Sequence, residues 1–462
     1  MPPLHVVILA AGKGTRMRSD RAKVLHRVAG VPMIDYVLDA AAVLHPASTT
    51  VVIGHQAEAL GAALSEAPGL SFANQAPQLG TAHALLAAEP QLRAAEGTLV
   101  LLSGDVPLLS AQTLERLVDR HHGAHAAATV LTAVVTSPAG YGRIVRVGEH
   151  IERIVEDRDA TSAEREIREV NAGVYAFALN GLFEAVRGIA AENTQRERYL
   201  PDLIAIYRRR GLIVETVAVS DPDEVLGVNS RAELAALGRK VRDRKNAGLM
   251  AAGVTLEDPA TAYIGRDVEI GGDTIVHPGV TIEGRTRIGM RCEIRSGVRI
   301  ADSTLGDDVV VLDHCVIADS AVENGARVGP FAHLRNGAAL GPEARVGNFV
   351  EVKKTALGEG SKALHLTYLG DAVIGPNVNI GAGVITCNYD GVNKHQTTIE
   401  SGAFVGSDTQ LIAPVTVGKD AYVGTGTTVR KDVPPGALAV SAGAQRNIAG
   451  WVKGKRKQKA DP

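Results

Sequence analysis

The second half of the chain carries an aliphatic residue at about every sixth position, and the register slips twice by one residue. A spacing of six fits neither the 3.6-residue period of a helix nor the two-residue period of a strand. It predicts a parallel β-helix with three flat faces, in which each hexad forms one face and its aliphatic side chain points inward. The alternative is a β-sandwich of many short strands, which would not hold so strict a register. The aliphatic positions are Ile264, Ile270, Val276, Ile282, Ile288, Ile294 and Ile300, then Leu305, Val311 and Ile317, then Val322, Val328, Leu334, Leu340, Val346 and Val352, then Ile374 and Ile380, and finally Ile399, Val405, Leu411, Val417, Val423 and Val429.

The first half shows a different pattern, in which short apolar runs alternate with longer amphipathic stretches. Apolar runs at 4–10, 51–53 and 99–102 are typical of buried strands of a parallel sheet. Helical spacing of apolar residues predicts helices over three ranges, 33–45, 81–95 and 111–121. This alternation indicates a doubly wound, Rossmann-like α/β domain, with its site at the carboxyl ends of the strands.

A helix is expected to join the two halves. Ser230-Arg-Ala-Glu233 has the form of a capping box, and apolar residues follow it at helical spacing. We therefore predict a first domain over 1–229, a linker helix over 230–251 and a coil domain over 252–462. The alternative is that this helix packs inside the first domain.

Composition and charge narrow the class of protein. The chain has 462 residues, a formal charge of −2, 50 glycines and only 3% aromatic residues. With this near-neutral balance, nothing in the charge argues for nucleic acid as the main partner, and no apolar run is long enough for a membrane span. Three scattered cysteines favour a reducing compartment, so we expect a cytoplasmic protein. The basic run at 453–459 is expected to be a solvated tail.

The first apolar strand leads into a glycine loop. In Gly12-Lys-Gly-Thr-Arg16, backbone amides can face a phosphate chain at the start of a helix. A dinucleotide fingerprint would need its third glycine at Met17, and a P-loop would need Gly-Lys-Ser/Thr after four spacers. The run from Leu9 to Met17, with Lys23 downstream, closely resembles the signature of sugar-nucleotide pyrophosphorylases. Those enzymes join a sugar 1-phosphate to a nucleoside triphosphate and release pyrophosphate.

This chemistry requires cations and a metal ion rather than covalent catalysis. The resemblance implies that Arg16 and Lys23 supply positive charge to the reacting phosphates. Asp105 lies just after a buried strand, where a carboxylate can hold Mg²⁺ beside phosphates. Asn229 matches the family's second metal ligand. The alternatives are that Asp105 is an ordinary turn residue and that Asn229 only starts the next helix.

The resemblance also implies contacts to the nucleotide and to the sugar. Ser103 departs from the family, which often has tyrosine there, and Glu156 taken alone would be an ordinary exposed carboxylate. The positions matched to the nucleotide and its sugar are Leu9, Ala10, Ala11, Gly12, Lys23, Gln75, Gly80, Thr81, Ser103, Gly104, Asp105, Gly142, Glu156, Asn171 and Asn229.

The hexads are interrupted at 361–370 and again at 386–394, and breaks in a solenoid often carry function. Both segments are similar to the hexapeptide-repeat acyltransferases, and most closely to the bifunctional N-acetylglucosamine-1-phosphate uridyltransferase/glucosamine-1-phosphate acetyltransferase family. The resemblance covers essentially the whole chain. It implies a left-handed coil, a homotrimer and acyl-CoA sites in the clefts between coils.

His365 lies in the first interruption and is our candidate general base. A histidine can take a proton from a sugar amine at neutral pH, which typically contributes about 10²–10⁴-fold to the rate. A purely structural histidine is the alternative. A metal-dependent hydratase on the same coil would need clustered histidines, and the spacing of the histidines does not indicate one.

Further positions in the coil match the family's acetyltransferase site. Ala442 stands where the family commonly has arginine, and Arg446 is a candidate replacement for that cation. The matches for the acceptor sugar phosphate are Arg335, Lys353, Tyr368, Asn379 and Lys394, and those for acetyl-CoA are Ala382, Asn388, Tyr389, Ser407, Thr425 and Ala442.

The resemblance therefore implies a two-step enzyme. Glucosamine 1-phosphate would be acetylated from acetyl-CoA, and the N-acetylglucosamine 1-phosphate formed would react with UTP and Mg²⁺ to give UDP-N-acetylglucosamine for cell-wall and lipopolysaccharide precursors. One alternative keeps only the nucleotidyltransferase and makes the coil an oligomerisation or allosteric module. Another is a repeat scaffold without enzymatic activity, which would leave the glycine loop unexplained.

Overall fold

The structure is a computed structural model that describes residues 2–65, 67–191, 193–441, 443, 445, 447–449 and 451–452. The chain divides into two compact units, Met1–Val241 and Arg242–Pro462. Among the described residues, no helix combines the length and the apolar character needed to cross a membrane.

The first unit is built on one mixed sheet with the strand order β11-β7-β10-β6-β1-β4-β5. The predicted strands are found as β1, β4 and β6, and the doubly wound α/β class is confirmed. Strand β10 runs antiparallel to both of its neighbours, which the sequence pattern did not predict. A hairpin of β8 and β9 pairs with the edge of β10. The bounds are β1 (Leu4–Leu9), β4 (Ser48–Ile53), β5 (Leu70–Asn74), β6 (Thr98–Ser103), β7 (Ala128–Val134), β8 (Arg143–Val147), β9 (His150–Val155), β10 (Glu169–Ala178) and β11 (Val214–Ala218).

Two separate clusters of buried aliphatic side chains include residues of the central strands, as expected for a sheet covered on both faces. The helix predicted over 81–95 is wrong as one element, because α3 ends at Ala87 and α4 begins at Glu89. Pro90 explains the break: it has no N–H to donate to the carbonyl of Leu86 in a continuous helix. The helices are α1 (Met33–Ala42), α2 (Ala57–Ala63), α3 (Thr81–Ala87), α4 (Glu89–Leu92), α5 (Ala111–Gly123), α6 (Ser162–Arg165), α7 (Leu182–Arg187) and α8 (Asp202–Arg209).

The predicted helix after Ser230 is α9 (Arg231–Ala251), and the compact units meet within it. Its capping box is formed: the amide of Glu233 donates to Ser230 Oγ at 3.2 Å, and the amide of Ser230 donates to Glu233 Oε2 at 3.1 Å. Leu237 and Val241 join a buried cluster of the first unit, whereas Leu249 joins the core of the second. Each half of the helix therefore contributes to a different core.

The second half of α9 makes polar contacts with the first turns of the coil. Lys245 Nζ donates to the carbonyl oxygens of Arg266 and Val268 at 3.0 and 2.6 Å. Asn246 Nδ2 donates to the carbonyl oxygens of Pro259 and Ala262 at 2.8 and 3.1 Å. These bonds satisfy backbone carbonyls at the start of the stack.

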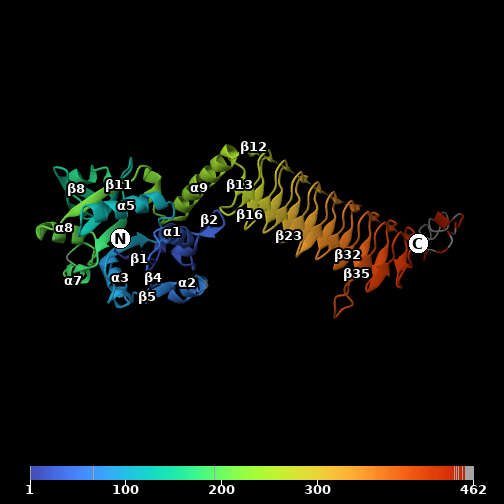
Figure 1. Cartoon of the computed structure of the whole chain (residues 1–462), viewed down its shortest axis with the longest axis horizontal. Helices are drawn as coiled ribbons and strands as arrows, with labels where there is room; N and C mark the ends of the chain where they lie inside the picture. Colours follow the sequence, from blue (N-terminus) through green and yellow to red (C-terminus); the bar gives the residue numbers. More distant parts are fainter. Residues whose placement is uncertain are drawn as a thin grey trace, which may run out of the picture. The chain divides into compact units, whose positions relative to one another are not determined.

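The second unit is a stack of three parallel sheets with 11, 10 and 9 strands (Figure 1). The first sheet runs from β12 (Thr255–Leu256) to β41 (Leu438–Ala439), the second from β13 (Tyr263–Ile264) to β40 (Thr428–Val429), and the third from β14 (Glu269–Ile270) to β38 (Val415–Val417). Every aliphatic position of the predicted hexad series is buried in one continuous core. The β-helix is confirmed.

The first predicted interruption, at 361–370, is wrong. Strand β30 (Lys362–His365) and β31 (Tyr368–Gly370) continue the stack in register with the preceding coil. Leu357, Ala363 and Leu369 fill the interior there. The aliphatic spacing did not predict these coils, because Leu357 follows Val352 after only five residues and because the inward residue at 363 is a small alanine.

The second interruption is a true insertion. It leaves the stack after β34 (Ile385–Cys387) and returns at β35 (Thr397–Ile399). Within the loop, Tyr389 and Lys394 form an isolated antiparallel bridge. The loop projects from the side of the stacked strands near β35 (Figure 1).

Candidate active sites

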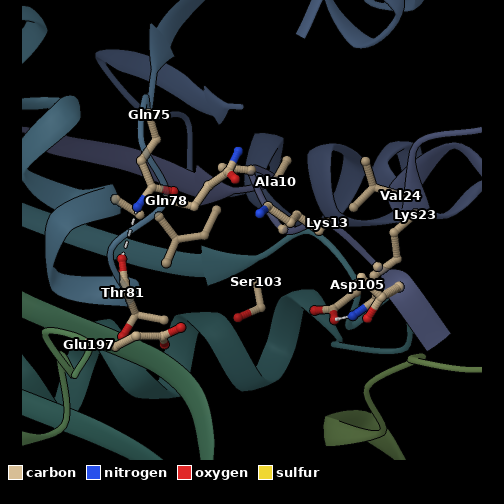
Figure 2. A pocket seen from close by; sticks show the side chains of 17 residues that line it. Ala10, Lys13, Lys23, Val24, Gln75, Gln78, Thr81, Ser103, Asp105 and Glu197 are labelled. Carbon is tan, nitrogen blue, oxygen red and sulfur yellow. Dashed lines mark hydrogen bonds and ion pairs between the residues drawn. The ribbon is translucent and has the colours of Figure 1, made fainter. Parts of the chain in front are cut away.

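The first unit has a pocket of about 510 Å³ at the carboxyl ends of its central strands. It is formed by the loops after β1, β5 and β6, as expected for an open α/β sheet. Figure 2 shows Lys23 and Asp105 meeting at one side of it, Gln75 and Thr81 at the other, and Ser103 between them. The lining residues are Leu9, Ala10, Ala11, Gly12, Lys13, Gly14, Thr15, Lys23, Val24, Gln75, Gln78, Gly80, Thr81, Ala84, Ser103, Asp105 and Glu197.

Sequence reasoning found most of this lining but missed four polar residues. Lys13, Thr15 and Gln78 lie inside the motifs that identified their neighbours, so their place in the motif was a usable signal. Glu197 comes from a distant segment and carried no local signal. Arg16, predicted as a catalytic cation, is exposed in the single 3₁₀ turn Thr15–Met17 and is not among the lining residues. Its role stays a prediction.

Lys23 joins the two predicted metal ligands. Its ammonium group donates to Asp105 Oδ2 and, at 2.6 Å, to Asn229 Oδ1. Gly14 allows this approach: it has φ +57°, and a Cβ there would lie 2.8 Å from Lys23 Cβ. Asp105 Oδ2 and Asn229 Oδ1 both face the Lys23 ammonium group, and two such oxygens are also ligands that suit Mg²⁺. Asp105 and Asn229 therefore fit a magnesium ion whose other ligands would be water and phosphate oxygens.

The opposite side of the pocket is held by a turn that only glycine can make. Gly80 has φ +102°, and a Cβ on it would lie 2.5 Å from the carbonyl oxygen of Arg198. The buried side chain of Gln75 donates to the Gly80 carbonyl at 3.0 Å. Thr81 Oγ1 accepts from the amide of Leu200 at 3.0 Å. The polar groups predicted to contact the base are thus fixed before any ligand binds.

The three predicted sugar-contacting residues lie together, although none of them is among the residues that line this pocket. A Cβ on Gly142 would be 3.5 Å from both Asn171 Cβ and Glu156 Oε1. Asn171 donates its amide N–H to the Gly142 carbonyl at 2.8 Å and its Nδ2 to the Tyr175 hydroxyl at 2.7 Å. Ser103 Oγ donates to the Gly173 carbonyl at 3.4 Å, which links the sugar-contacting segment to the pocket. Gly104 packs against the Leu9 carbonyl, 3.2 Å from where its Cβ would be.

Glu156 is not the exposed carboxylate that its position in the sequence suggested. It is half-buried, and burial together with the charges of Asp202, Asp159 and Asp157 raises its pKa, although Arg143 opposes the shift. A carboxyl group that resists ionisation can donate as well as accept hydrogen bonds. This suits a contact to the hydroxyl or amide groups of a sugar.

In the second unit, His365 is exposed at the end of β30 and lines a groove of about 300 Å³. Its Nδ1 lies 2.9 Å from Oδ1 of Asn348, at the end of β27 (Arg345–Asn348). Arg327 and Arg345 line the same groove. The imidazole is therefore accessible, as a general base must be. Sequence reasoning did not single out Asn348.

Two of the predicted phosphate-binding cations, Lys353 and Lys394, lie near one carboxylate together with Lys354, which was not predicted. Lys353 Nζ donates to Asp371 Oδ2 at 3.1 Å, and Lys354 Nζ lies 3.6 Å from Oδ1. Burial acts to raise the pKa of Asp371, but hydrogen bonds from Lys353 and Asn388 and the lysine charges lower it overall. The side chain of Lys394 lies beside that of Lys353, which lowers the pKa of Lys394. Three lysines around a single aspartate leave an excess of positive charge for an anion.

The sheet that holds Lys353 also carries other predicted sugar contacts. In β25 (His333–Arg335), Arg335 pairs in register with Lys353 of β28 (Glu351–Lys353) and donates to Glu351 Oε1 at 2.6 and 2.8 Å. Tyr368 pairs with Glu351 on the next coil. Asn379, in β33 (Asn379–Ile380), pairs with Lys362, three residues before His365. Asn379 therefore belongs to the first sheet, whereas Lys353 belongs to the second. Its contact with the sugar stays a prediction.

The predicted acetyl-CoA positions follow one corner of the coil away from His365. The amide of Gly383 donates to the His365 carbonyl at 3.4 Å, and that of Asp408 donates to the Ala382 carbonyl at 2.7 Å. One coil further on, the amide of Gly426 donates to the Ser407 carbonyl at 2.9 Å, which places Thr425 next in the row. These backbone bonds stack Ala382, Ser407 and Thr425 in successive coils.

The inserted loop starts at a different corner of the coil, between β34 of the second sheet and β35 of the third. Asn388 is buried, and its Nδ2 donates to Asp371 Oδ2. Tyr389 is exposed, and its hydroxyl donates to the Gly391 carbonyl at 2.6 Å. Ala442 and Arg446, at which the chain departs from the family pattern, lie outside the described residues.

The fold and the two sites define a class of protein, a transferase with a nucleotide pocket in an α/β unit and an acyl-transfer groove on a β-helix. Residues 6–172 match the family described as MobA-like NTP transferase domain, and residues 263–364 match the GMPPB C-terminal domain. The bifunctional protein GlmU of Syntrophotalea carbinolica is 52% identical over 97% of this chain and 96% of its own length. The GlmU of Pelobacter propionicus is 48% identical over 98% of each chain, and that of Geotalea uraniireducens is 47% identical over 98% and 99%. The chain belongs to the GlmU family of bifunctional proteins.

Proposed function

We propose that this chain makes UDP-N-acetylglucosamine from glucosamine 1-phosphate, acetyl-CoA and UTP in two steps. The proposal rests on membership in the GlmU family and, above all, on the meeting of Asp105, Asn229 and Lys23 beside the glycine loop. The second unit, over Arg242–Pro462, carries out the acetyl transfer. The first unit, over Met1–Val241, carries out the uridylyl transfer.

In the acetyl transfer, the amine of glucosamine 1-phosphate attacks the thioester carbonyl of acetyl-CoA. A C–N bond forms and the C–S bond breaks. His365 accepts the proton that the amine loses and passes it to the departing sulfur, so that CoA leaves as the thiol. The excess positive charge of Lys353, Lys354 and Lys394 around Asp371 holds the sugar phosphate. Acetyl-CoA lies along the corner that carries Ala382, Ser407 and Thr425.

In the uridylyl transfer, a phosphate oxygen of N-acetylglucosamine 1-phosphate attacks the α-phosphorus of UTP, and pyrophosphate leaves. Mg²⁺ would be held by Asp105 and Asn229 and, when bound, neutralises charge on the phosphates. Lys23 and the amides of the glycine loop orient the triphosphate. Gln75 and Thr81 contact the base, and Glu156 and Asn171 contact the sugar.

The active form is proposed to be a homotrimer. An apolar ladder runs along the coil corner next to His365, where the rings of His314 and Phe331 stack at 5.2 Å and those of Phe331 and Phe349 at 5.4 Å. Phe331, Phe349 and Leu366 are all largely exposed in the single chain. Exposed apolar ladders of this kind are typical of interaction surfaces. Light scattering of the purified protein should give a mass of three chains.

The defining experiment incubates purified protein with glucosamine 1-phosphate, acetyl-CoA, UTP and Mg²⁺. UDP-N-acetylglucosamine should form only when all four are present. Without acetyl-CoA, N-acetylglucosamine 1-phosphate should restore the product. The proposal fails if glucosamine 1-phosphate is never acetylated. If N-acetylglucosamine 1-phosphate alone is used, the chain is a nucleotidyltransferase whose coil serves only assembly.

A further inference from the structure

We propose that Asn348 is a positioning residue that fixes the tautomer and the direction of the His365 ring. The inference rests on the proposed role of His365 as the base. Asn348 Oδ1 lies 2.9 Å from His365 Nδ1, within normal hydrogen-bonding distance. Both side chains line the same groove. Among the described residues of the predicted acetyltransferase site, none makes a side-chain hydrogen bond to the imidazole.

The chemistry follows from the acceptor. An amide oxygen has no proton to donate, so this bond requires the proton on Nδ1 of the neutral imidazole. The lone pair then resides on Nε2, on the far side of the ring from Asn348. As the C–N bond forms, Nε2 accepts the proton that the attacking amine loses, and the ring then passes this proton to the departing sulfur of CoA. Without the acceptor, the neutral ring can place its proton on either nitrogen and can rotate about its side-chain bonds.

The fold places Asn348 with little freedom. Asn348 and His365 are Cα partners in the parallel pairing of β27 with β30. The carbonyl of Asn348 accepts from the amide of Leu366 at 3.1 Å, which fixes the turn that follows His365. A Cβ on Gly347 would lie 1.9 Å from the carbonyl oxygen of Leu364, so the two strands touch at this point. The backbone on both sides of Asn348 is thus fixed against the strand that carries His365.

The groups around the ring have a clear charge pattern. Arg327 and Arg345 face the groove from the two preceding coils, and Lys362 lies at the start of the same strand as His365. Among the described residues that line this groove, none is acidic. A neutral acceptor therefore orients the ring without adding a negative charge, whereas an aspartate in its place would stabilise the imidazolium.

The test compares Asn348→Ala, Asn348→Asp and His365→Ala in the full-length protein, with release of CoA thiol as the readout. For Asn348→Ala we expect kcat of acetyl transfer to fall about 10- to 100-fold, because part of the general-base contribution is lost, with KM for both substrates within about twofold. Asn348→Asp can only accept, so it should restore most of kcat and move the acidic limb of the pH–rate profile to higher pH.

Three outcomes would overturn the inference. They are a kcat for Asn348→Ala within twofold of the parent, an Asn348→Asp variant as slow as Asn348→Ala, or a double variant Asn348→Ala/His365→Ala much slower than His365→Ala alone. The second outcome would mean that the asparagine donates its amide N–H to Nδ1 instead. The third would mean that Asn348 acts independently of the histidine.

Matched controls separate this inference from folding and from the proposed function. Asn324 is an exposed asparagine at a different corner of the same β-helix, between β23 and β24, and its Oδ1 accepts from the amide of Asp307 at 2.8 Å. Asn324→Ala removes a similar acceptor far from His365 and should leave kcat unchanged. If His365→Ala retains acetyl transfer, the proposed base is wrong. If His365→Ala is inactive while Asn348→Ala is normal, only the positioning role is wrong.

Discussion

At the scale of single residues, Glu156 is both a predicted sugar contact and a carboxyl group whose ionisation destabilises the folded state. Its carboxyl group is partly removed from water and lies near three aspartates, and burial is the largest cause of its raised pKa. The folded state therefore opposes ionisation of Glu156. Groups at binding sites often show such shifts, because the arrangement serves the ligand rather than the empty fold.

We predict that Glu156→Gln stabilises the first unit at alkaline pH while impairing uridylyl transfer. The pKa of Glu156 in the folded state lies above its unfolded value of about 4.5. As the pH rises from about 4.5 through the folded pKa, ionisation of this carboxyl group therefore lowers the free energy of unfolding. Thermal unfolding at pH 8 should give a higher Tm for the variant, and the difference should shrink toward pH 4.5. Glu152→Gln, at an exposed carboxylate on the strand that precedes Glu156, should show no such trend. An equal Tm at pH 8 would refute the prediction.

Asp105 gives a second prediction at this scale. Asp105→Asn keeps the size of the side chain and an acceptor for Lys23 but removes the charge that would hold Mg²⁺ and balance the lysine. We expect pyrophosphate release from UTP to fall by at least about 100-fold. Acetyl transfer by the same preparation should be unchanged. Asp119→Asn, at an exposed position on α5, is the matched control. Near-normal pyrophosphate release would exclude Asp105 from the site.

At the scale of elements, the turn before α3 decides the shape of the nucleotide pocket. Gly80→Ala forces a side chain into a backbone conformation with φ +102° and against the Arg198 carbonyl. We expect a loss of stability of about 1–3 kcal/mol and a higher KM for UTP, because Gln75 and Thr81 lose their common support. Gly61→Ala is the contrasting variant: it lies in α2, and its Cβ would meet nothing within 4 Å. It should be neutral or stabilise by up to about 1 kcal/mol, as measured by urea unfolding.

The elements also show how far sequence reasoning reaches. The hexads fixed the inward positions of the coil, because a period of six is a local property that each turn repeats. The direction of β10 could not be predicted, because strand pairing depends on residues far apart in the chain. The glycine loop, Lys23 and Asp105 were found through short motifs. Asn348, Asp371 and Glu197 were missed because each acts through a contact with a distant segment, as Asn348 does with a histidine 17 residues later.

At the scale of the whole molecule, the two sites use separate residues from separate units. All residues of the nucleotide pocket lie before Val241, and those of the acetyl-transfer groove lie after Arg242. We predict that Asp105→Asn and His365→Ala, each unable to make UDP-N-acetylglucosamine from glucosamine 1-phosphate, do so when mixed. The acetylated intermediate would pass through solution from one protein to the other. Product formation should follow a lag that shortens as protein concentration rises, and a mixture that stays inactive would show that the intermediate is not released.

The second half of α9 has a consequence for the protein in concentrated solution. A stack of parallel strands ends in a rung whose carbonyls and amides could recruit another chain, as happens when fibrils grow. Lys245 and Asn246 occupy carbonyls at the first turns, and Leu249 closes the apolar interior at that end. We therefore expect this helix to prevent end-to-end polymerisation, so that a chain in which the segment melts should form filaments before its β-helix unfolds.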